Sequence, residues 1–263
     1  MADLNEDTRL EAAGPGRYIA DISSAWKVWG PNGGYLSALL LRAVGRETDK
    51  ALPVSFACQY LRVAEFGRAI VEVETLKEGS RSSAYQARLI QDDRVQVQAQ
   101  VWTGDPRPGP AHQLTSPPEC FVELDGAGAR PPVGPMPFWD RLEIRGVRAT
   151  GGRYSHWYRF DPRPEVDDAY VDGARSLVLI DSMHWPARYF MEAEPPRYAG
   201  PSLDLYVRFH RFRPSSEWLF SDAVSVCAEN GIVAGEATVW DEDGLLLASG
   251  GGQTSMQPVD EAY

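Results

Sequence analysis

One acidic residue of this sequence lies within an apolar run, where a buried carboxylate could act as a catalytic group. Asp181 lies inside the otherwise apolar run LVLIDSMHW, residues 177–185. Burying an unpaired carboxylate costs several kcal/mol, so this side chain needs hydrogen-bond partners. Burial also makes a carboxylate a stronger base that can take a proton from water. Two interpretations stay open: a structural aspartate satisfied by neighbouring backbone, or the general base of a hydrolytic reaction.

The other residue types that often do chemistry are dispersed. No histidine stands at ligand spacing from a cysteine or a carboxylate cluster, and no cysteine pair has CxxC spacing, so we expect no metal and no cofactor. Cysteines within strand-like patterns are commonly small, buried and inert, and we expect reduced thiols here. The residues concerned are Cys58, Cys120, Cys227, His112, His156, His184 and His210.

Composition restricts the partners. Of the 263 residues, 43% are hydrophobic and 24% charged, which is typical of a globular protein. The formal net charge of −11 argues against a nucleic-acid partner, because phosphate binding needs basic surface. No window reaches the roughly 20 apolar residues of a membrane helix, and the acidic N-terminus is unlike a signal peptide, so we expect no membrane partner and a cytoplasmic location.

A proline-rich stretch divides the chain. Residues 104–137 contain nine of the 20 prolines, which cannot supply a sheet ladder or a helix interior. We therefore expect an N-terminal domain at 1–103, a linker at 104–137 and a C-terminal domain at 138–263 that carries the catalytic residues.

Each half shows the same order of elements. An apolar helix is expected at 35–44 and again at 174–185, and several strand-like patterns follow each one. Tyr60-Leu61-Arg62 and Phe209-His210-Arg211 lie 149 positions apart, and the acidic turns at 92–93 and 242–243 lie 150 apart. A steady offset indicates two copies of one unit. We predict an α+β fold, a tandem or double hotdog, in which long antiparallel curved sheets each wrap a central helix and join edge to edge.

The two arginines at matching strand ends suggest a shared role. Arg62 and Arg211 close the repeated tripeptides. We expect an ion pair that fixes the geometry between the copies, and contact with a coenzyme A phosphate is the alternative.

Several motifs together resemble the double-hotdog acyl-CoA thioesterases of the thioesterase II type. The second half carries Phe-His-Arg, Glu-Trp-Leu, Gly-Glu and Asp-Gly-x-Leu-x-Ala-Ser leading to a glutamine, and the first half carries SFACQYLR and WGPNGGY. The resemblance covers most of residues 17–256. It implies that Asp181, Ser202 and Gln253 position a hydrolytic water.

Two departures from the family pattern affect this site. Ser202 replaces the usual threonine and keeps a hydroxyl donor. The approach to Gln253 reads Ala-Ser-Gly-Gly-Gly, one residue longer than the pattern, which a bulge at glycine could absorb. The aim of Gln253 is therefore an open question.

Thioester hydrolysis also needs donors for the developing oxyanion. The free N–H groups at the N-termini of the central helices suit this role. We expect Gly33, Gly34, Tyr35 and Trp185 to bind substrate, although a tight turn and close packing would explain the two glycines equally well.

The leading hypothesis is hydrolysis of an acyl-CoA to free acid and coenzyme A, in fatty acid metabolism. A non-catalytic protein that binds an acyl-CoA or an acyl carrier is the first alternative. A hotdog enoyl-CoA hydratase is the second, since Asp181 and His184 are three residues apart, but the Asn-Pro that precedes the hydratase histidine is missing. A homo-oligomer is possible.

Overall fold

The computed structural model describes residues 2–121, 124–129, 136–189 and 198–258. The elements of the first half are α1 (Leu4–Asp7), β1 (Glu11–Gly14), β2 (Arg17–Ile22), the 3₁₀ turn η1 (Ser24–Trp26), α2 (Gly33–Glu47), β3 (Leu52–Tyr60), β4 (Gly67–Lys77), β5 (Ser82–Gln91) and β6 (Arg94–Gly104). Those that follow are η2 (Leu124–Gly126), β7 (Gly128–Ala129), η3 (Pro137–Arg141), β8 (Leu142–Thr150), β9 (Arg153–Phe160), α3 (Ala169–Tyr189), β10 (Tyr198–Ala199), β11 (Asp204–Phe209), β12 (Leu219–Glu229), β13 (Ile232–Trp240), β14 (Leu246–Ser255) and β15 (Gln257–Pro258).

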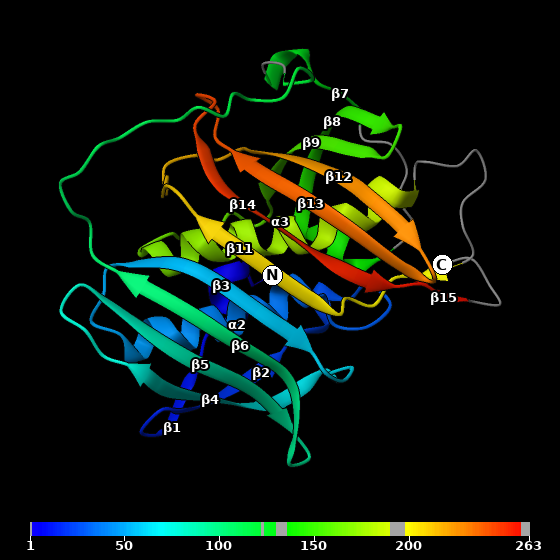
Figure 1. Cartoon of the computed structure of the whole chain (residues 1–263). Coiled ribbons are helices and arrows are strands. Elements are labelled where there is room, and N and C mark those ends of the chain that lie inside the picture. The colour runs from blue at the N-terminus through cyan, green and yellow to red at the C-terminus, as the bar shows by residue number, and fades with distance from the viewer. Residues whose placement is uncertain (1, 122–123, 130–135, 190–197, 259–263) are drawn as a thin grey trace.

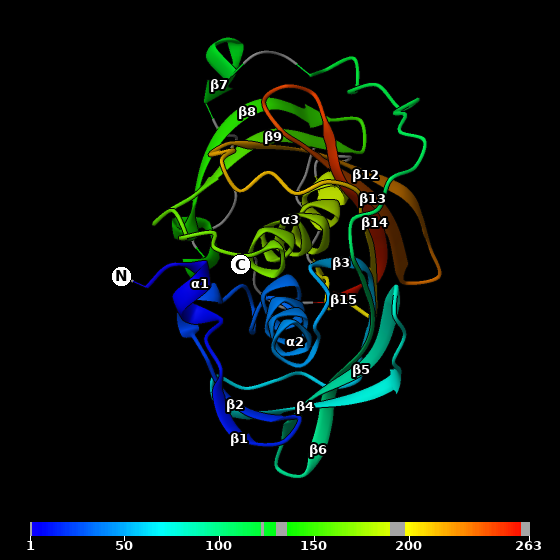
Figure 2. The ribbon, with the colours of Figure 1, turned by 90° about the vertical axis from the view of Figure 1, so that its left-hand side faces the viewer.

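One large antiparallel sheet organises the molecule (Figure 1). Its 13 described strands follow the order β1-β2-β4-β5-β6-β3-β11-β14-β13-β12-β9-β8-β7. The order from β2 to β3 is repeated in reverse from β11 to β9, as two copies of one unit require. The sheet curves around the two long helices, which lie together in its hollow (Figure 2). The predicted double hotdog is confirmed.

The two units join through their edge strands. β3 pairs antiparallel with β11, with Asp204 opposite Gln59 and Arg208 opposite Ser55. An unpaired edge strand exposes a row of N–H and C=O groups, and this pairing satisfies both edges at once. The expected edge-to-edge joint is therefore present.

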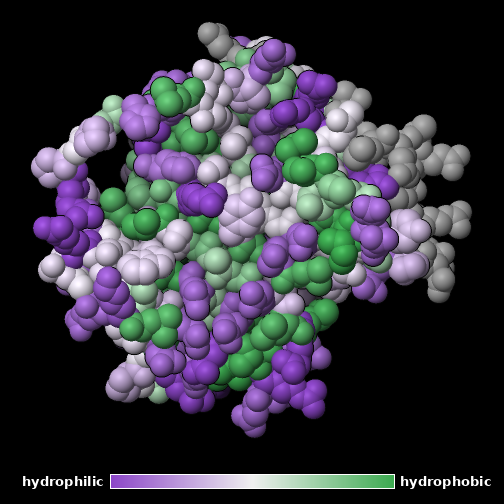
Figure 3. Space-filling view, viewed as in Figure 1, coloured by the Kyte–Doolittle hydropathy of each residue, from purple (hydrophilic) through white to green (hydrophobic). Residues whose placement is uncertain are grey.

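The central helices form the core because neither has a continuous polar face. Most of α2 is buried, including Leu39, Leu40 and Leu41 at 0% exposure. A helix that is apolar on every side must be covered on every side, and α2 packs between α3 and the strands of its own unit (Figure 2). The outer face of the sheet, which faces the viewer in Figure 3, mixes hydrophilic and hydrophobic side chains. An antiparallel sheet with one solvated face has this character.

The segment between the units packs against the second one. The ring of Phe121 packs at an angle against two aromatic rings on the outer side of the sheet, with its centroid 5.3 Å from that of Trp157 and 5.1 Å from that of Phe220. β7 extends the sheet beyond β8. The strands β1, β2, β8 and β9 widen the two units beyond what the sequence indicated. The domain boundaries themselves remain a prediction.

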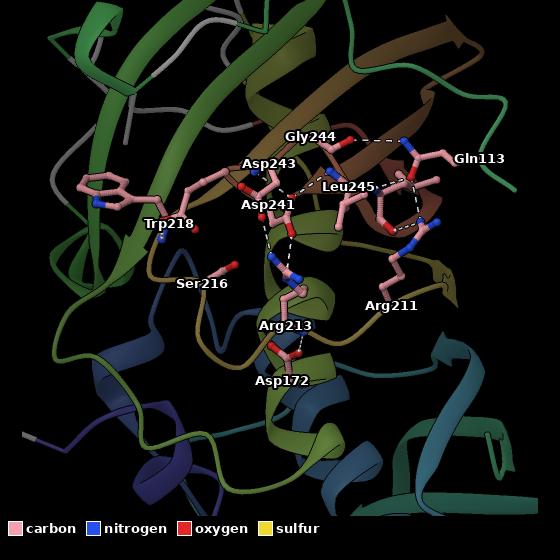
Figure 4. A network of polar contacts seen from close by, with 12 residues as sticks. Gln113, Asp172, Arg211, Arg213, Ser216, Trp218, Asp241, Asp243, Gly244 and Leu245 are labelled. Carbon is pink, nitrogen blue, oxygen red and sulfur yellow. Dashed lines mark hydrogen bonds and ion pairs between the residues drawn. The ribbon is translucent and has the colours of Figure 1, made fainter. Parts of the chain in front are cut away.

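The arginines that close the repeated tripeptides do not form the expected ion pair with any residue in the described part of the chain. Arg62 Nη1 donates to the carbonyl of Val95 at 2.8 Å, and Arg211 Nη1 donates to the carbonyl of Leu246 at 3.2 Å. Each arginine thus holds the start of a long strand within its own unit, which corrects the expectation. Arg211 also donates to Gln113 Oε1 at 2.8 Å, tying the interdomain segment to this strand (Figure 4).

The residues that follow the second tripeptide form a structural network (Figure 4). Arg213 Nε lies 3.0 Å from the fully buried carboxylate of Asp241, and its backbone N–H donates to Asp172 at 2.6 Å. Asp241 also accepts the backbone N–H groups of Asp243 and Leu245. The motif residues here join the β13–β14 turn to α3, so they support the fold.

None of the described helices combines the length and apolar character needed to cross a membrane.

Candidate active site

A cavity of about 380 Å³ opens beside the point where the two central helices meet. Its walls come from the entry to α2, the end of β3, η3, the second half of α3, the segment before β11, the end of β14 and β15. The apolar residues of its lining include Val28, Trp29, Leu36, Met136, Phe138, Trp139, Trp185 and Pro186. The polar residues include Asn32, Tyr60, Arg62, Asp181, Ser182, Ser202, Thr254, Ser255 and Gln257.

Asp181 lies in this lining and is 5% exposed. Its Oδ2 accepts the backbone N–H of Gly34 at 2.7 Å. Its Oδ1 accepts the hydroxyl of Ser202 at 3.1 Å and that of Tyr60 at 3.3 Å. The carboxylate therefore has the hydrogen bonds that its burial demands, and they come from three different segments of the chain.

The N-terminus of α2 is built to approach Asp181 closely. Asn32 caps the helix by accepting the N–H of Tyr35 at 2.9 Å, and its Nδ2 donates to Ser182 on α3 at 2.9 Å. A Cβ on Gly33 would come 2.9 Å from Asp181 Oδ2, and one on Gly34 would come 2.7 Å from Val178 Cα. Side chains at these two positions would push the helices apart, so both glycines are needed for close packing.

Close packing leaves one helix-end donor beside the cavity. Gly33 is the first residue of α2 and lines the cavity. Its N–H belongs to the first turn, whose donors have no partner within the helix, and it donates to no other described residue. The dipole of α2 adds positive potential at this end.

Tyr60 brings a group from the N-terminal unit into the site. Its hydroxyl, which donates a hydrogen bond to Asp181, also lies 2.8 Å from Ser37 Oγ on α2. Burial, followed by the charge of Asp181, raises the pKa of Tyr60 well above its ordinary value, so the hydroxyl keeps its proton and acts as a donor. Burial also raises the pKa of the neighbouring Cys58 thiol to about 12, which makes Cys58 inert as a nucleophile.

Two of the three expected water-positioning residues are brought together, and the third is not. Ser202 contacts Asp181, as described above. Gln253 is exposed and does not line the cavity, whereas its neighbour Thr254 is 1% exposed and does. Side chains alternate between the two faces of a strand, so Gln253 points to the outer face and Thr254 to the inner one. This corrects the expected placement of Gln253.

The glycine run before Gln253 carries no bulge. The register of β14 on β13 shifts between Leu246 and Ala248 and then runs without interruption through Gln253 to Ser255. The first unit has the same irregularity in β6, between Val95 and Val97, so it belongs to the repeated unit. The bulge that we expected at the glycines is not formed.

Some of the expected substrate-binding residues line the cavity and others do not. Gly33 and Trp185 line the cavity, and Gly34 serves Asp181 through its N–H. Tyr35 is fully buried, stacks on Trp26 with ring centroids 5.3 Å apart and donates to the carbonyl of Asp7 at 2.7 Å. Tyr35 is therefore a core residue, which corrects that expectation. The side chain of His184, named for the hydratase alternative, lies outside the described part of the structure.

Sequence reasoning did not assign Tyr60 or Thr254 to the site. Tyr60 belongs to a repeated tripeptide, but nothing local indicates that it meets an aspartate 121 positions later. Thr254 directly follows Gln253, which the family pattern selected. The extra residue in the sequence before Gln253 was the one feature that pointed to a change of position at this site.

Comparisons with known proteins agree with this architecture. The model of the acyl-CoA thioesterase N-terminal domain matches residues 22–104, and that of the acyl-CoA thioesterase C-terminal domain matches residues 117–253. No curated protein is similar enough to the sequence to count as a match.

Solved structures show the same fold at low identity. A conserved hotdog-fold protein of unknown function from Alicyclobacillus acidocaldarius has a TM-score of 0.85 and 18% identity over 97% of this chain and 98% of its own. Acyl-CoA thioesterase II of Mycobacterium marinum has a TM-score of 0.81 and 19% identity over 98% and 99%. The tesB protein of Mycobacterium avium subs paratuberculosis has a TM-score of 0.81 and 21% identity over 97% and 98%. With both family models matched in order along a double hotdog, the chain belongs to the acyl-CoA thioesterase family.

Proposed function

We propose that this thioester hydrolase converts an acyl-CoA and water into a free acid and coenzyme A, with Asp181 as the general base. The observation that carries the proposal is a buried carboxylate in the wall of a largely apolar cavity, beside the N-terminus of a helix. A general base must reach the proton that it removes, and a cavity-lining carboxylate meets that condition for a water bound there.

The reaction needs one water and no other reactant. Asp181 takes a proton from the water while the water oxygen forms a bond to the thioester carbonyl carbon. The C–S bond then breaks with its electron pair on sulfur, and the proton held by Asp181 passes to the coenzyme A thiolate. The carbonyl carbon leaves as the carboxylic acid.

The negative charge that develops on the carbonyl oxygen would be stabilised at the start of α2. Gly33 lines the cavity at that point, and its N–H and the positive end of the helix dipole would supply this stabilisation. Ser202 and Tyr60 donate to Oδ1 of Asp181 and hold the carboxylate in a fixed orientation. We assign them to positioning the base.

The acyl group would occupy the apolar part of the cavity. Trp29, Phe138 and Trp185 supply aromatic surface there, while Arg62 lines the same cavity and offers a cation for a coenzyme A phosphate. A role in cytoplasmic fatty acid metabolism and a homo-oligomeric state remain predictions from the sequence.

The test is thiol release from a panel of acyl-CoA substrates, followed with a disulfide dye. Asp181→Asn keeps an oxygen for the Gly34 N–H but removes the base, and we expect kcat to fall roughly 10²- to 10⁴-fold. Binding of a non-hydrolysable thioether analogue should persist. Asp93→Asn, at the exposed β5–β6 turn, is the matched control and should behave like the wild type.

Three results would contradict the proposal. Unchanged turnover in Asp181→Asn would remove Asp181 from the mechanism. Analogue binding by the wild type without thiol release from any substrate would favour the non-catalytic alternative. Hydration of crotonyl-CoA without thiol release would favour the hydratase.

A further inference from the structure

The hydroxyl of Thr254 is a buried polar group that the assignments above leave unused. Thr254 is 1% exposed, lines the cavity, and its Oγ1 has no hydrogen-bond partner among the described residues. A buried hydroxyl without a partner costs roughly 1–3 kcal/mol, so such a group is normally satisfied by water or by a ligand. The cavity is the place from which such a partner can reach it.

Strand pairing places Thr254 opposite Ser202, which contacts the proposed base. Thr254 forms an isolated antiparallel bridge with Ser202, whose own hydroxyl donates to Asp181 Oδ1 at 3.1 Å. Residues directly opposite in an antiparallel pair have their Cβ atoms about 5 Å apart on the same face. Thr254, Ser202 and Asp181 therefore form one polar group in the cavity wall.

The neighbouring backbone prevents Gln253 from taking this position. A Cβ at Gly250 would lie 2.0 Å from the carbonyl oxygen of Tyr206, and one at Gly252 would lie 2.3 Å from that of Asp204. The backbone N–H of Gln253 also donates to Asp204 Oδ1 at 2.8 Å. Tight packing on β11 thus holds the register of β14, with Gln253 outward and Thr254 inward.

We propose that the Thr254 hydroxyl positions the attacking water against Asp181, in the place that the family pattern assigns to Gln253. A hydroxyl has one donor and two acceptor sites, so it can accept from the water while the water donates its other proton to the carboxylate. Thr254 is a positioning residue, since the proton passes to Asp181. This inference rests on the proposed hydrolysis.

The test compares matched variants at adjacent positions. Thr254→Val keeps the shape and removes the hydroxyl, and kcat should fall about tenfold, as expected for one lost hydrogen bond, with KM within twofold and the unfolding temperature unchanged. Thr254→Ser should recover most of the activity. Gln253→Ala should stay within twofold of the wild type.

Two measurements separate failure of this inference from failure of the proposed function. A high-resolution crystal structure of the wild type should contain a water bonded to both Thr254 Oγ1 and Asp181. Full activity in Thr254→Val, a Gln253→Ala loss as large as that of Thr254→Val, or no such water would overturn the role of Thr254 while leaving hydrolysis intact. Absence of thiol release by the wild type would overturn the proposed function, and this inference with it.

Discussion

Asp181 of α3 packs against Gly34 of α2, and the symmetrical contact on the other side of the molecule joins Gly45 of α2 to Tyr170 of α3. The helix caps establish this correspondence, because Asn32 and Asp168 both cap their helices with a side-chain oxygen. A Cβ on Gly34 would lie 3.1 Å from Asp181 Cβ, and one on Gly45 would lie 2.7 Å from the Tyr170 ring. One contact holds a carboxylate at a helix end, and the other is filled by an aromatic ring.

Three other residues of the site differ in the same direction, whereas Thr254 corresponds to another threonine, Thr103. By strand register, Tyr60 corresponds to Phe209 and Ser202 to Pro53. Ser37, which contacts Tyr60, corresponds to Gly173, whose Cβ would lie 3.2 Å from Phe209. These residues are replaced by ones that cannot donate or accept a side-chain hydrogen bond.

This difference between the two sides shows which of these residues the fold does not require. The same helix pair and sheet are built with Asp181 and three hydroxyls on one side and with Gly45, Phe209, Pro53 and Gly173 at the matching positions on the other. The architecture therefore does not require the polar set, and a function is the better explanation for its presence. The predictions below test this contrast by altering one side at a time.

The largest effect is expected where the helices are closest. In Gly34→Ala the new Cβ would lie 2.7 Å from Val178 Cα and 2.8 Å from the carbonyl oxygen of Leu177, both of them backbone atoms. Overpacking of this kind should lower the free energy of unfolding by about 3 kcal/mol. It should also lower kcat at least tenfold, because the Gly34 N–H moves away from Asp181. Denaturant unfolding and thiol release measure the two effects.

Gly45→Ala is the matched variant on the other side. Its Cβ meets the ring of Tyr170, so stability should fall, but the kcat of the folded protein should stay near that of the wild type. Gly109→Ala, which has no atom within 4 Å of the new Cβ, should change neither quantity. Equal losses of kcat in Gly34→Ala and Gly45→Ala would mean that the two contacts are not distinct.

A second contrast concerns acid stability. His156 on β9 is fully buried, and burial lowers its pKa to about 3. By strand register its counterpart is Tyr18, which does not titrate in acid. Below about pH 6.5 the unfolded chain protonates this histidine while the folded protein does not, so stability should fall by about 1.4 kcal/mol per pH unit down to about pH 3.

His156→Gln removes the titration. Unfolding measured from pH 7 to pH 4 should show a shallower loss of stability in this variant than in the wild type, whatever its stability at pH 7. Parallel curves for the two proteins would show that other groups govern the acid response.

The smallest effect is expected from a single hydroxyl. Tyr60→Phe gives the active side the residue that the other side already has, and it removes one donor from Asp181 Oδ1. We expect kcat to fall about fivefold, equivalent to roughly 1 kcal/mol, with little change in KM. Phe209→Tyr should leave kcat unchanged, and an equal effect in both variants would contradict the asymmetry.

Local sequence patterns determined most of the fold. The apolar runs at 35–44 and 174–185 predicted two fully covered helices, because a helix without a polar face has to be buried. Period-two alternation and a steady offset predicted two equivalent antiparallel units. The isolated Asp181 in an apolar run was enough to indicate a buried carboxylate that needs partners, whatever its role.

Tertiary structure alone decided which residues meet that carboxylate. Tyr60 and Gly34 come from the other unit, and the sequence carries no signal for a contact across more than 100 positions. The choice of Thr254 over Gln253 depends on strand register, where a change of one residue exchanges the inner and outer faces. That register is held by contacts of β14 with β11 and β13, so it could be known only once the sheet had been assembled.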